Sequence, residues 1–179
     1  MIFTLKPRLV RTDKEWEILR LIRNSCRESF SHDQREITPE MQKAYRAALV
    51  RNERTVLHYL YFDQDVAVGF SRMYQNSSSQ ITVTFGVALW ARGCHYEHQI
   101  VPMMMLAAGG PMIADVLLTN EGSRLINNHY GFIETRKDHC LSYIECEWPP
   151  MQLIRRLGGQ HGKAEDHPTI QGGDEQTGK

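Results

Sequence analysis

Three β-rich segments follow one another between residues 55 and 89, and the connections between them are too short to hold a helix. A connection of three to five residues joins antiparallel neighbours, because parallel strands need a crossover of a dozen residues or more. The sequence therefore predicts an antiparallel meander of three strands. Its strands are Thr55–Phe62, Val66–Tyr74 and Gln80–Leu89.

Two helical patterns and a short strand precede this meander. Phe3–Val10 is the predicted strand, and Pro7 indicates that it lies at an edge of the sheet or is interrupted. Thr12-Asp13 offers the N-cap of a first helix, and Thr38 is the expected N-cap of a second, with proline at its first helical position. Apolar residues at helical spacing predict the buried faces. They are Trp16, Leu19, Ile22, Cys26 and Phe30 in the first helix, and Met41, Tyr45 and Leu49 in the second.

Helices and strands alternate after the meander. A helix is predicted over His95–Ala108, where Gly109-Gly110 ends it and Pro102 either kinks it or marks a later start. The remaining expected elements are a strand at Met112–Leu118, a helix at Glu121–Tyr130 and a hairpin of Phe132–Lys137 with Cys140–Trp148. The predicted class is α+β, with a mixed, mostly antiparallel central sheet of about six to seven strands flanked by helices.

Length and composition predict one globular domain. The chain has 179 residues, of which 41% are hydrophobic and 23% charged. Pro149-Pro150 is a natural domain end, and from Gly158 the chain has almost no apolar residues. We therefore expect a domain over residues 1–148, and a short appended segment with a disordered polar tail over 149–179.

Charge and cysteine content limit the functional classes. The formal net charge is zero, so no global field attracts nucleic acid or anionic lipid. The nearly apolar stretch Ile100–Ala108 is too short to span a membrane, which needs about 20 residues. The four cysteines form no CxxC pair, which is typical of a reduced, cytoplasmic protein.

Two segments resemble the GNAT superfamily of N-acyltransferases. Gly86–Ala108 is similar to the family's pyrophosphate segment, in which a strand ends, an Arg/Gln-x-x-Gly-x-Gly/Ala loop follows and a helix starts. Thr119–Phe132 resembles the Asn-led helix that ends in Gly-Phe. The stretch IRNSCRESF…ITPEMQKAY is also similar to a region of several small-substrate and sugar-nucleotide N-acyltransferases. The resemblance covers about residues 3–148. It implies the GNAT fold, acetyl-CoA or another acyl-CoA as donor, and a primary amine of a small molecule or amino sugar as acceptor.

The resemblance also implies a set of donor-binding residues. A helix N-terminus presents unpaired backbone N–H groups that suit the pyrophosphate of coenzyme A. Val87 or Leu89 corresponds to the backbone N–H that contacts the acyl carbonyl, and Asn120 to the residue beside the pantetheine. The expected loop residues are Arg92, Gly93, Cys94, His95, Tyr96, Glu97 and His98. The two motif glycines are replaced by His95 and Glu97, whose side chains we expect to crowd the loop and, for the glutamate, to repel phosphate.

The catalytic candidates are His58 and Asn127. Acyl transfer needs a base for the amine and a proton for the departing sulfur. Many GNATs place a proton-donating tyrosine four residues before the glycine of Gly-Phe, and Asn127 stands there in this chain. The strand Gln80–Leu89 contains no acid that could act as base. His58, on the neighbouring strand, could replace it directly or through water; the alternative is a strand histidine with a satisfied hydrogen bond.

Several alternatives stay open. The loop residues His32, Asp33 and Glu36 could recognise an amine or be simply polar. Cys94, His95 and His98 could contribute to a metal site, but their spacing matches no known ligand motif and we expect no metal. The fold could also serve a nucleic-acid-base-modifying enzyme or an inactive binding or assembly module, and a homodimer stays open. If the protein modifies nucleic-acid bases, arginines of the basic N-terminal helices would contact the nucleic acid: Arg20, Arg23, Arg27 and Arg46.

Overall fold

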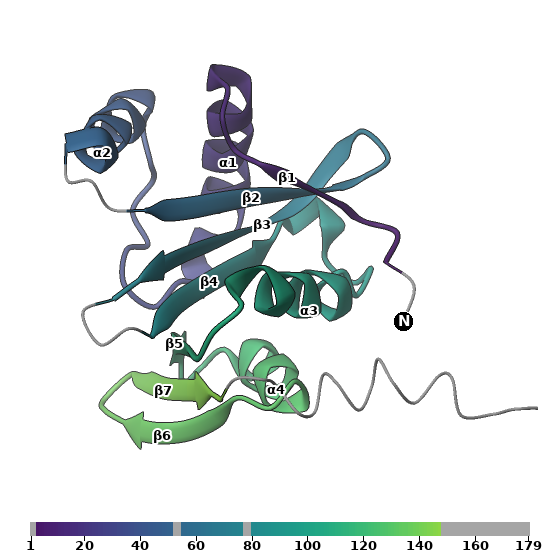
Figure 1. Cartoon of the computed structure of the whole chain (residues 1–179), viewed down its shortest axis with the longest axis vertical. Coiled ribbons are helices and arrows are strands. Elements are labelled where there is room, and N and C mark those ends of the chain that lie inside the picture. The colour runs from purple at the N-terminus through teal and green to yellow at the C-terminus, as the bar shows by residue number, and fades with distance from the viewer. Residues whose placement is uncertain (1–2, 52–54, 77–79, 148–179) are drawn as a thin grey trace, which may run out of the picture.

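The structure, a computed structural model, describes residues 3–51, 55–76 and 80–147. Within these residues, seven strands form one sheet in the order β1-β2-β3-β4-β5-β7-β6 (Figure 1). The strands are β1 (Lys6–Leu9), β2 (Val56–Asp63), β3 (Val66–Gln75), β4 (Ile81–Val87), β5 (Met112–Leu117), β6 (Ile133–Lys137) and β7 (Leu141–Cys146). The helices are α1 (Asp13–Ser25), α2 (Pro39–Arg51), α3 (Glu97–Ala108) and α4 (Glu121–His129), with short 3-10 turns η1 (Arg27–Ser29) and η2 (Leu89–Ala91). The α+β class is confirmed.

The predicted meander is confirmed as β2, β3 and β4. Both connections join antiparallel strands, with His58 opposite Arg72 and Arg72 opposite Thr84. The predicted cap of α1 is also confirmed: Thr12 and Glu15 form a reciprocal capping box. The appended segment and tail predicted over 149–179 lie outside the described residues.

The helices cover the two faces of the sheet. Leu19 and Ile22 of α1 pack in one cluster with Leu60 and Phe70, which lie opposite each other on β2 and β3. On the other face, α3 lies so close to β3 that a Cβ at Gly69 would be 2.5 Å from Ile100 Cδ1. Glycine at this position therefore allows α3 to pack directly on the strand. None of the described helices is long and apolar enough to cross a membrane.

The strands β4 and β5 separate soon after they pair. They run parallel, and their register contains two pairs, Ile81 with Met112 and Thr82 with Ile113. Both strands continue beyond this point, to Val87 and Leu117. The unpaired ends diverge and leave a gap in the middle of the sheet. This gap positions the candidate site.

Pro102 lies inside α3, as the sequence predicts, and its cost is offset by the residue that follows α4. Proline has no N–H, so the carbonyl of His98, four residues earlier, loses its helical partner. The hydroxyl of fully buried Tyr130 donates to this carbonyl at 2.9 Å. Tyr130 therefore joins the two helices.

Replacing Tyr130 by phenylalanine removes this hydrogen bond and keeps the ring. We expect Tyr130→Phe to lower the free energy of unfolding by about 1–2 kcal/mol, because the His98 carbonyl loses its partner. Urea denaturation of both proteins measures the change. Tyr143→Phe, which removes an exposed hydroxyl bonded to Asp138, is the matched control and should cost less.

Three sequence expectations are wrong in detail. The first helix ends at Ser25 and continues into η1, although Cys26 and Phe30 are buried as predicted. Met41 is 37% exposed, and no residue of α2 is fully buried. Leu89 lies outside β4, in η2, since the chain turns after Val87 toward the next loop.

Candidate active site

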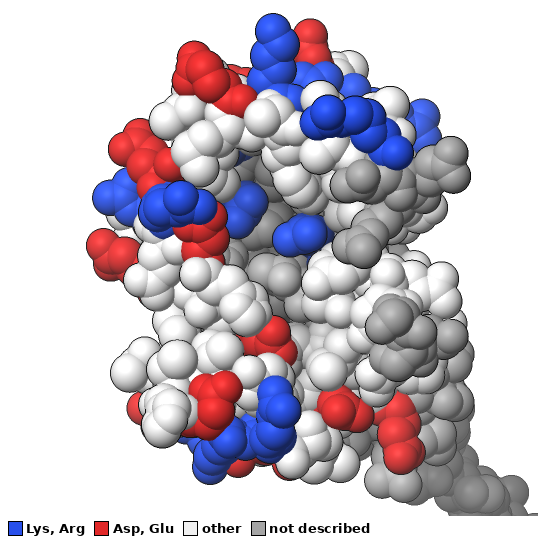
Figure 2. Space-filling model, turned by 90° about the vertical axis from the view of Figure 1, so that its left-hand side faces the viewer, with Lys and Arg blue, Asp and Glu red and all other residues white. Residues whose placement is uncertain are grey.

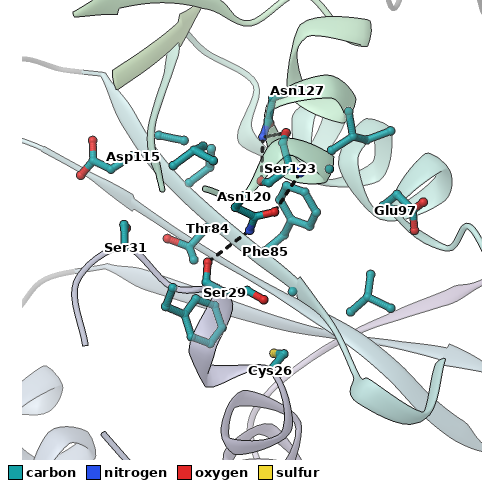
Figure 3. A pocket seen from close by; sticks show the side chains of 18 of the residues that line it. Cys26, Ser29, Ser31, Thr84, Phe85, Glu97, Asp115, Asn120, Ser123 and Asn127 are labelled. Carbon is teal, nitrogen blue, oxygen red and sulfur yellow. Dashed lines mark hydrogen bonds between the residues drawn. The ribbon is translucent and has the colours of Figure 1, made fainter. Parts of the chain in front are cut away.

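A cleft of about 350 Å³ occupies the gap between β4 and β5 (Figure 3). Asp115 and Ser31 lie at one end of the cleft and Glu97 at the other, with Asn120 between them. The lining residues come from both diverging strands, the turn after α1, the start of α3 and the first turns of α4. The residues used below are Cys26, Ser29, Val87, Arg92, Glu97, Asp115, Asn120, Ser123 and Asn127.

The loop before α3 presents unpaired backbone N–H groups. Within the described residues, the N–H groups of Gly93, His95, Tyr96 and Glu97 donate to no acceptor. Gly93 and His95 have positive φ angles of 83° and 56°. His95 therefore adopts the backbone conformation that favours the glycine of the motif, at a cost of about 1–2 kcal/mol. Such a set of N–H groups at a helix N-terminus suits a phosphate anion.

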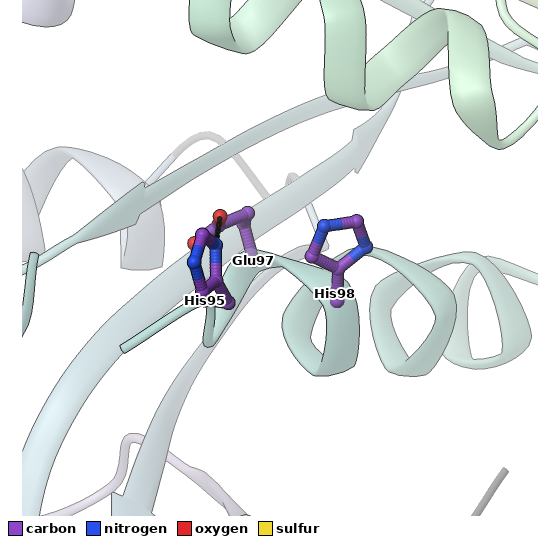
Figure 4. A group of neighbouring side chains, drawn as sticks. All are labelled: His95, Glu97 and His98. Carbon is purple, nitrogen blue, oxygen red and sulfur yellow. Dashed lines mark hydrogen bonds and ion pairs between the residues drawn. The ribbon is translucent and has the colours of Figure 1, made fainter. Parts of the chain in front are cut away.

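The two side chains that replace the motif glycines lie differently. The imidazole of His95 is 78% exposed and points out of the loop, so it does not fill the space that we expected it to crowd. The carboxylate of Glu97 is 29% exposed and lines the cleft, 3.3 Å from His95 Nδ1 (Figure 4). Glu97 is thus the side chain that places negative charge beside the N–H groups.

The two backbone candidates for the acyl carbonyl are separated by the structure. Val87 ends β4 and lines the cleft. Leu89 is exposed, and its N–H donates to Ser25 Oγ at 3.2 Å. Of the two, Val87 keeps the position required for the role.

Asn120 connects the two sides of the cleft. Its Oδ1 accepts from Ser123 N–H at 3.1 Å and caps α4, while its Nδ2 donates to Ser29 O at 3.4 Å. The side chain therefore fixes the start of α4 relative to the turn after α1, in addition to the pantetheine contact expected from the sequence.

Asn127 is buried beside the cleft and cannot act as a general acid. Its Nδ2 donates to the carbonyl of Ser123 at 2.8 Å, and its Oδ1 has no partner within the described residues. The carbonyl of Ser123 only accepts, so the atom facing it must be the amide nitrogen. The orphaned Oδ1 can accept a hydrogen bond from a ligand, but an amide has no proton to give to a thiolate.

Cys26 lines the cleft but is not a nucleophile. Burial raises the pKa of its thiol to about 11, and its Sγ donates to Ile22 O at 3.2 Å. The thiol therefore stays protonated at neutral pH and is a poor nucleophile.

Asp115 is a cleft residue that was not predicted from the sequence. This residue lies in β5, between buried Ala114 and Val116, and its Oδ2 is 2.7 Å from His32 Nε2. The pair joins positions 83 residues apart at one end of the cleft. An acid at a half-buried position of a predicted strand was the available signal. The carboxylate and imidazole together can accept and pass on a proton.

His58 lies away from the cleft, in a second pocket between α1, α2 and β2. Its Nε2 is 3.1 Å from Tyr45 Oη, and its Nδ1 has no partner within the described residues. Burial, followed by the positive charges of Arg72 and Arg23, lowers the pKa of His58 to about 3. A group with so low a pKa is a weak base at neutral pH, which does not suit the role expected from the sequence.

The neutral His58 makes the fold sensitive to acid. The unfolded chain binds this proton with the ordinary pKa of 6.5 and the folded chain with a pKa of about 3. Stability from this group is therefore complete above pH 6.5 and falls as the pH drops toward 3, by up to about 1.4 kcal/mol per pH unit. Urea denaturation between pH 7 and 5 should show a shallower fall for His58→Gln, while the exposed-site variant His139→Gln keeps the parent slope.

The metal hypothesis involves a different set of residues from the one expected. The ligand atoms of His95, Glu97 and His98 lie within 4.8 Å of one another, whereas Cys94 is not part of this group (Figure 4).

The arginines expected to contact nucleic acid are mostly paired: Arg20 with Glu17, Arg27 with Glu36 and Arg46 with Asp13. These ion pairs reduce the positive field of the N-terminal helices.

No protein-family model and no curated protein matches the sequence. Solved structures do match. An N-acetyltransferase from Staphylococcus aureus Mu50 has a TM-score of 0.66 at 15% identity, over 80% of this chain and 98% of that one. A spermidine N-acetyltransferase from Vibrio cholerae, in complex with CoA and spermine, has a TM-score of 0.71 at 9% identity, over 84% and 98%. A Salmonella typhimurium protein with its cofactor acetyl-CoA has a TM-score of 0.65 at 11% identity, over 81% and 94%.

The chain has the GNAT fold. The GNAT fold predicted from the segments Gly86–Ala108 and Thr119–Phe132 is thereby confirmed. In this chain β4 and β5 separate after two paired positions, and α3 begins with Glu97, which stands at the second glycine position of the motif.

Proposed function

We propose that this protein transfers an acetyl group from acetyl-CoA to the primary amine of a small molecule. The observation that carries the proposal is a cleft between β4 and β5 that ends at the unpaired N–H groups of residues 93–97. A pyrophosphate suits these N–H groups, and an extended pantetheine arm suits a narrow gap between two strands. The Vibrio and Salmonella proteins, which share the fold, hold CoA and acetyl-CoA.

In this proposal the donor runs from the loop along β4. The N–H groups of Gly93, His95, Tyr96 and Glu97 receive the pyrophosphate, and Arg92 adds a positive charge at the mouth of the cleft. The N–H of Val87 faces the acetyl carbonyl and stabilises the oxyanion that forms there. Backbone groups do most of this work, so His95 at the first glycine position leaves these N–H groups unpaired, whereas the charge of Glu97 weakens the binding of the pyrophosphate.

Asp115 and His32 supply the base. An ammonium group at the end of the cleft gives a proton to this pair, and its nitrogen then attacks the acetyl carbonyl. The tetrahedral intermediate collapses as the carbon–sulfur bond breaks. The first proton passes to water through the exposed His32, and the pair takes the second nitrogen proton as the intermediate collapses. The pair then protonates the thiolate, directly or through water, because Asn127 has no proton to give.

The release of free CoA tests the proposal. Purified protein is incubated with acetyl-CoA and a panel of primary amines, the free thiol is followed with a thiol reagent, and the acetylated product is identified by mass spectrometry. Amine-dependent thiol release with an acetamide product supports the transferase. Acetyl-CoA binding without any amine-dependent release would leave a binding module instead.

A further inference from the structure

The pocket that contains His58 has a volume of about 140 Å³, and positive charge from two arginines acts on this histidine. Arg23 of α1 lines it, and Arg72 of β3 lies opposite His58 in the strand register. Within the described residues, neither guanidinium lies within 4 Å of a carboxylate, whereas Arg20, Arg27 and Arg46 each have one. Asp33, the acid that lines the pocket, is occupied by Arg35 at 3.0 Å.

Aromatic rings and burial surround these two arginines in place of anions. The guanidinium of Arg72 lies 4.8 Å from the ring centroid of Tyr74 and 5.8 Å from that of Tyr45, and its Nε is buried without a hydrogen-bond partner. Arg23 lies 5.4 Å from the ring of Phe30. Burial, and then the charge of Arg72, lowers the pKa of Arg23.

Such an arrangement is costly unless a ligand completes it. Two nearby like charges repel, and buried donors without acceptors lose their hydration. His58 adds a neutral ring that is 97% buried, with its Nδ1 unpartnered within the described residues. An oxyanion would compensate both arginines, and the planar guanidinium fork matches a carboxylate or phosphate.

The pocket and the transfer cleft share one face of the sheet. His58, Arg72 and Thr84 lie side by side on β2, β3 and β4, about 4.8 Å apart from strand to strand. Thr84 lines the cleft, and the register of Thr82 with Ile113 places Asp115 on the same face beyond the gap. Figure 2 shows a hollow in the molecular surface with Lys or Arg side chains inside it. Both acidic and basic side chains lie around its rim.

We propose that Arg23 and Arg72 bind an anionic group of the acceptor, so that the substrate is an amine that also carries a carboxylate or a phosphate. The proposal rests on the transferase function proposed above. The acid is held at the arginines, and the amine reaches across Thr84 toward Asp115. The acceptor is therefore a short molecule with its acid and its amine a few bonds apart.

A charge-matched substrate series tests this proposal. The ω-amino acids from glycine to 6-aminohexanoate are each compared with their amides, and O-phosphoethanolamine with ethanolamine, by amine-dependent CoA release. We expect kcat/KM to be at least tenfold higher for acids than for amides, with a maximum at one chain length. The phosphate pair separates a phosphate-specific site from a carboxylate-specific one.

Variants assign the preference to the arginines. Arg72→Gln and Arg23→Gln should bring the ratio of kcat/KM for acids to kcat/KM for amides close to one. Arg72→Lys should keep part of the preference for acids. Arg51→Gln, at the exposed end of α2, is the matched control and should keep the full ratio. Amides used as well as acids by the parent protein, or a ratio that survives Arg72→Gln, would overturn the proposal.

A second measurement needs no turnover. In protein labelled with 15N-arginine, malonate and inorganic phosphate should shift the Nε–Hε signals of Arg23 and Arg72 and leave that of Arg51 in place. If no amine is acetylated, the transferase proposal fails. The NMR shifts still show whether Arg23 and Arg72 bind an anion. Absence of any shift at Arg23 and Arg72 would refute the anion site even in an active enzyme.

Discussion

Replacing Asp115 by asparagine is expected to lower kcat for amine acetylation by roughly 100-fold or more, with little change in acetyl-CoA affinity. General acid–base catalysis by a positioned side chain contributes roughly 10²- to 10⁴-fold. Asp115 lines the cleft, and its Oδ2 is 2.7 Å from His32 Nε2. The amide of asparagine keeps the shape of the side chain but accepts no proton at neutral pH.

Controls separate proton transfer from damage to the fold. Asp65→Asn changes an exposed acid in the turn between β2 and β3 and should leave kcat unchanged. His32→Gln should lower kcat by less than Asp115→Asn does, because the imidazole is 67% exposed and water can take its place. Near-normal kcat in a folded Asp115→Asn protein would show that the base lies elsewhere.

Replacing Glu97 by glutamine is expected to tighten acetyl-CoA binding by roughly 30-fold, which corresponds to about 2 kcal/mol. The Glu97 carboxylate lines the cleft beside the unpaired N–H groups where a pyrophosphate would lie. Two like charges about 8 Å apart repel by about 2 kcal/mol at the effective dielectric constant of a protein surface. Isothermal titration calorimetry on both proteins measures the difference.

The chain offers a matched control for this change. Glu97 is the first residue of α3, and Glu121 is the first residue of α4, so both carboxylates interact with a helix dipole. Glu121 is exposed and does not line the cleft. Glu121→Gln should leave affinity unchanged, and S-acetylpantetheine, which lacks the pyrophosphate, should bind Glu97→Gln no better than the parent. Equal tightening for both donors would contradict the electrostatic explanation.

Local signals predicted much of the fold. The short connections at residues 63–65 and 76–79 require antiparallel strands, and Thr12 and Thr38 are caps whose hydroxyls accept from the first turn of their helices. Such features depend on residues a few positions apart. A period-two pattern alone could not show that Leu89 lies outside the strand. The turn after Val87 involves a contact with a residue distant in the sequence, since the N–H of Leu89 donates to Ser25 Oγ.

The site was less predictable because its contacts are distant in the sequence. The phosphate-type loop could be located from Arg92-Gly93 and the helix that follows, since these are neighbours in the chain. The contact of His32 with Asp115 spans 83 positions and depends on how far β4 and β5 diverge. For His58, the sequence pattern predicted a strand position, but its low pKa arises from burial under other elements and then from the charges of Arg72 and Arg23.

A titration of the purified protein with acetyl-CoA, coenzyme A and S-adenosylmethionine, followed by the thermal unfolding temperature, tests the donor site most directly. A ligand held at 100 times its Kd stabilises the folded state by about 2.7 kcal/mol. We expect both CoA compounds to raise the unfolding temperature and S-adenosylmethionine to leave it unchanged. No rise with either CoA compound at millimolar concentration would contradict an acyl-CoA site between β4 and β5.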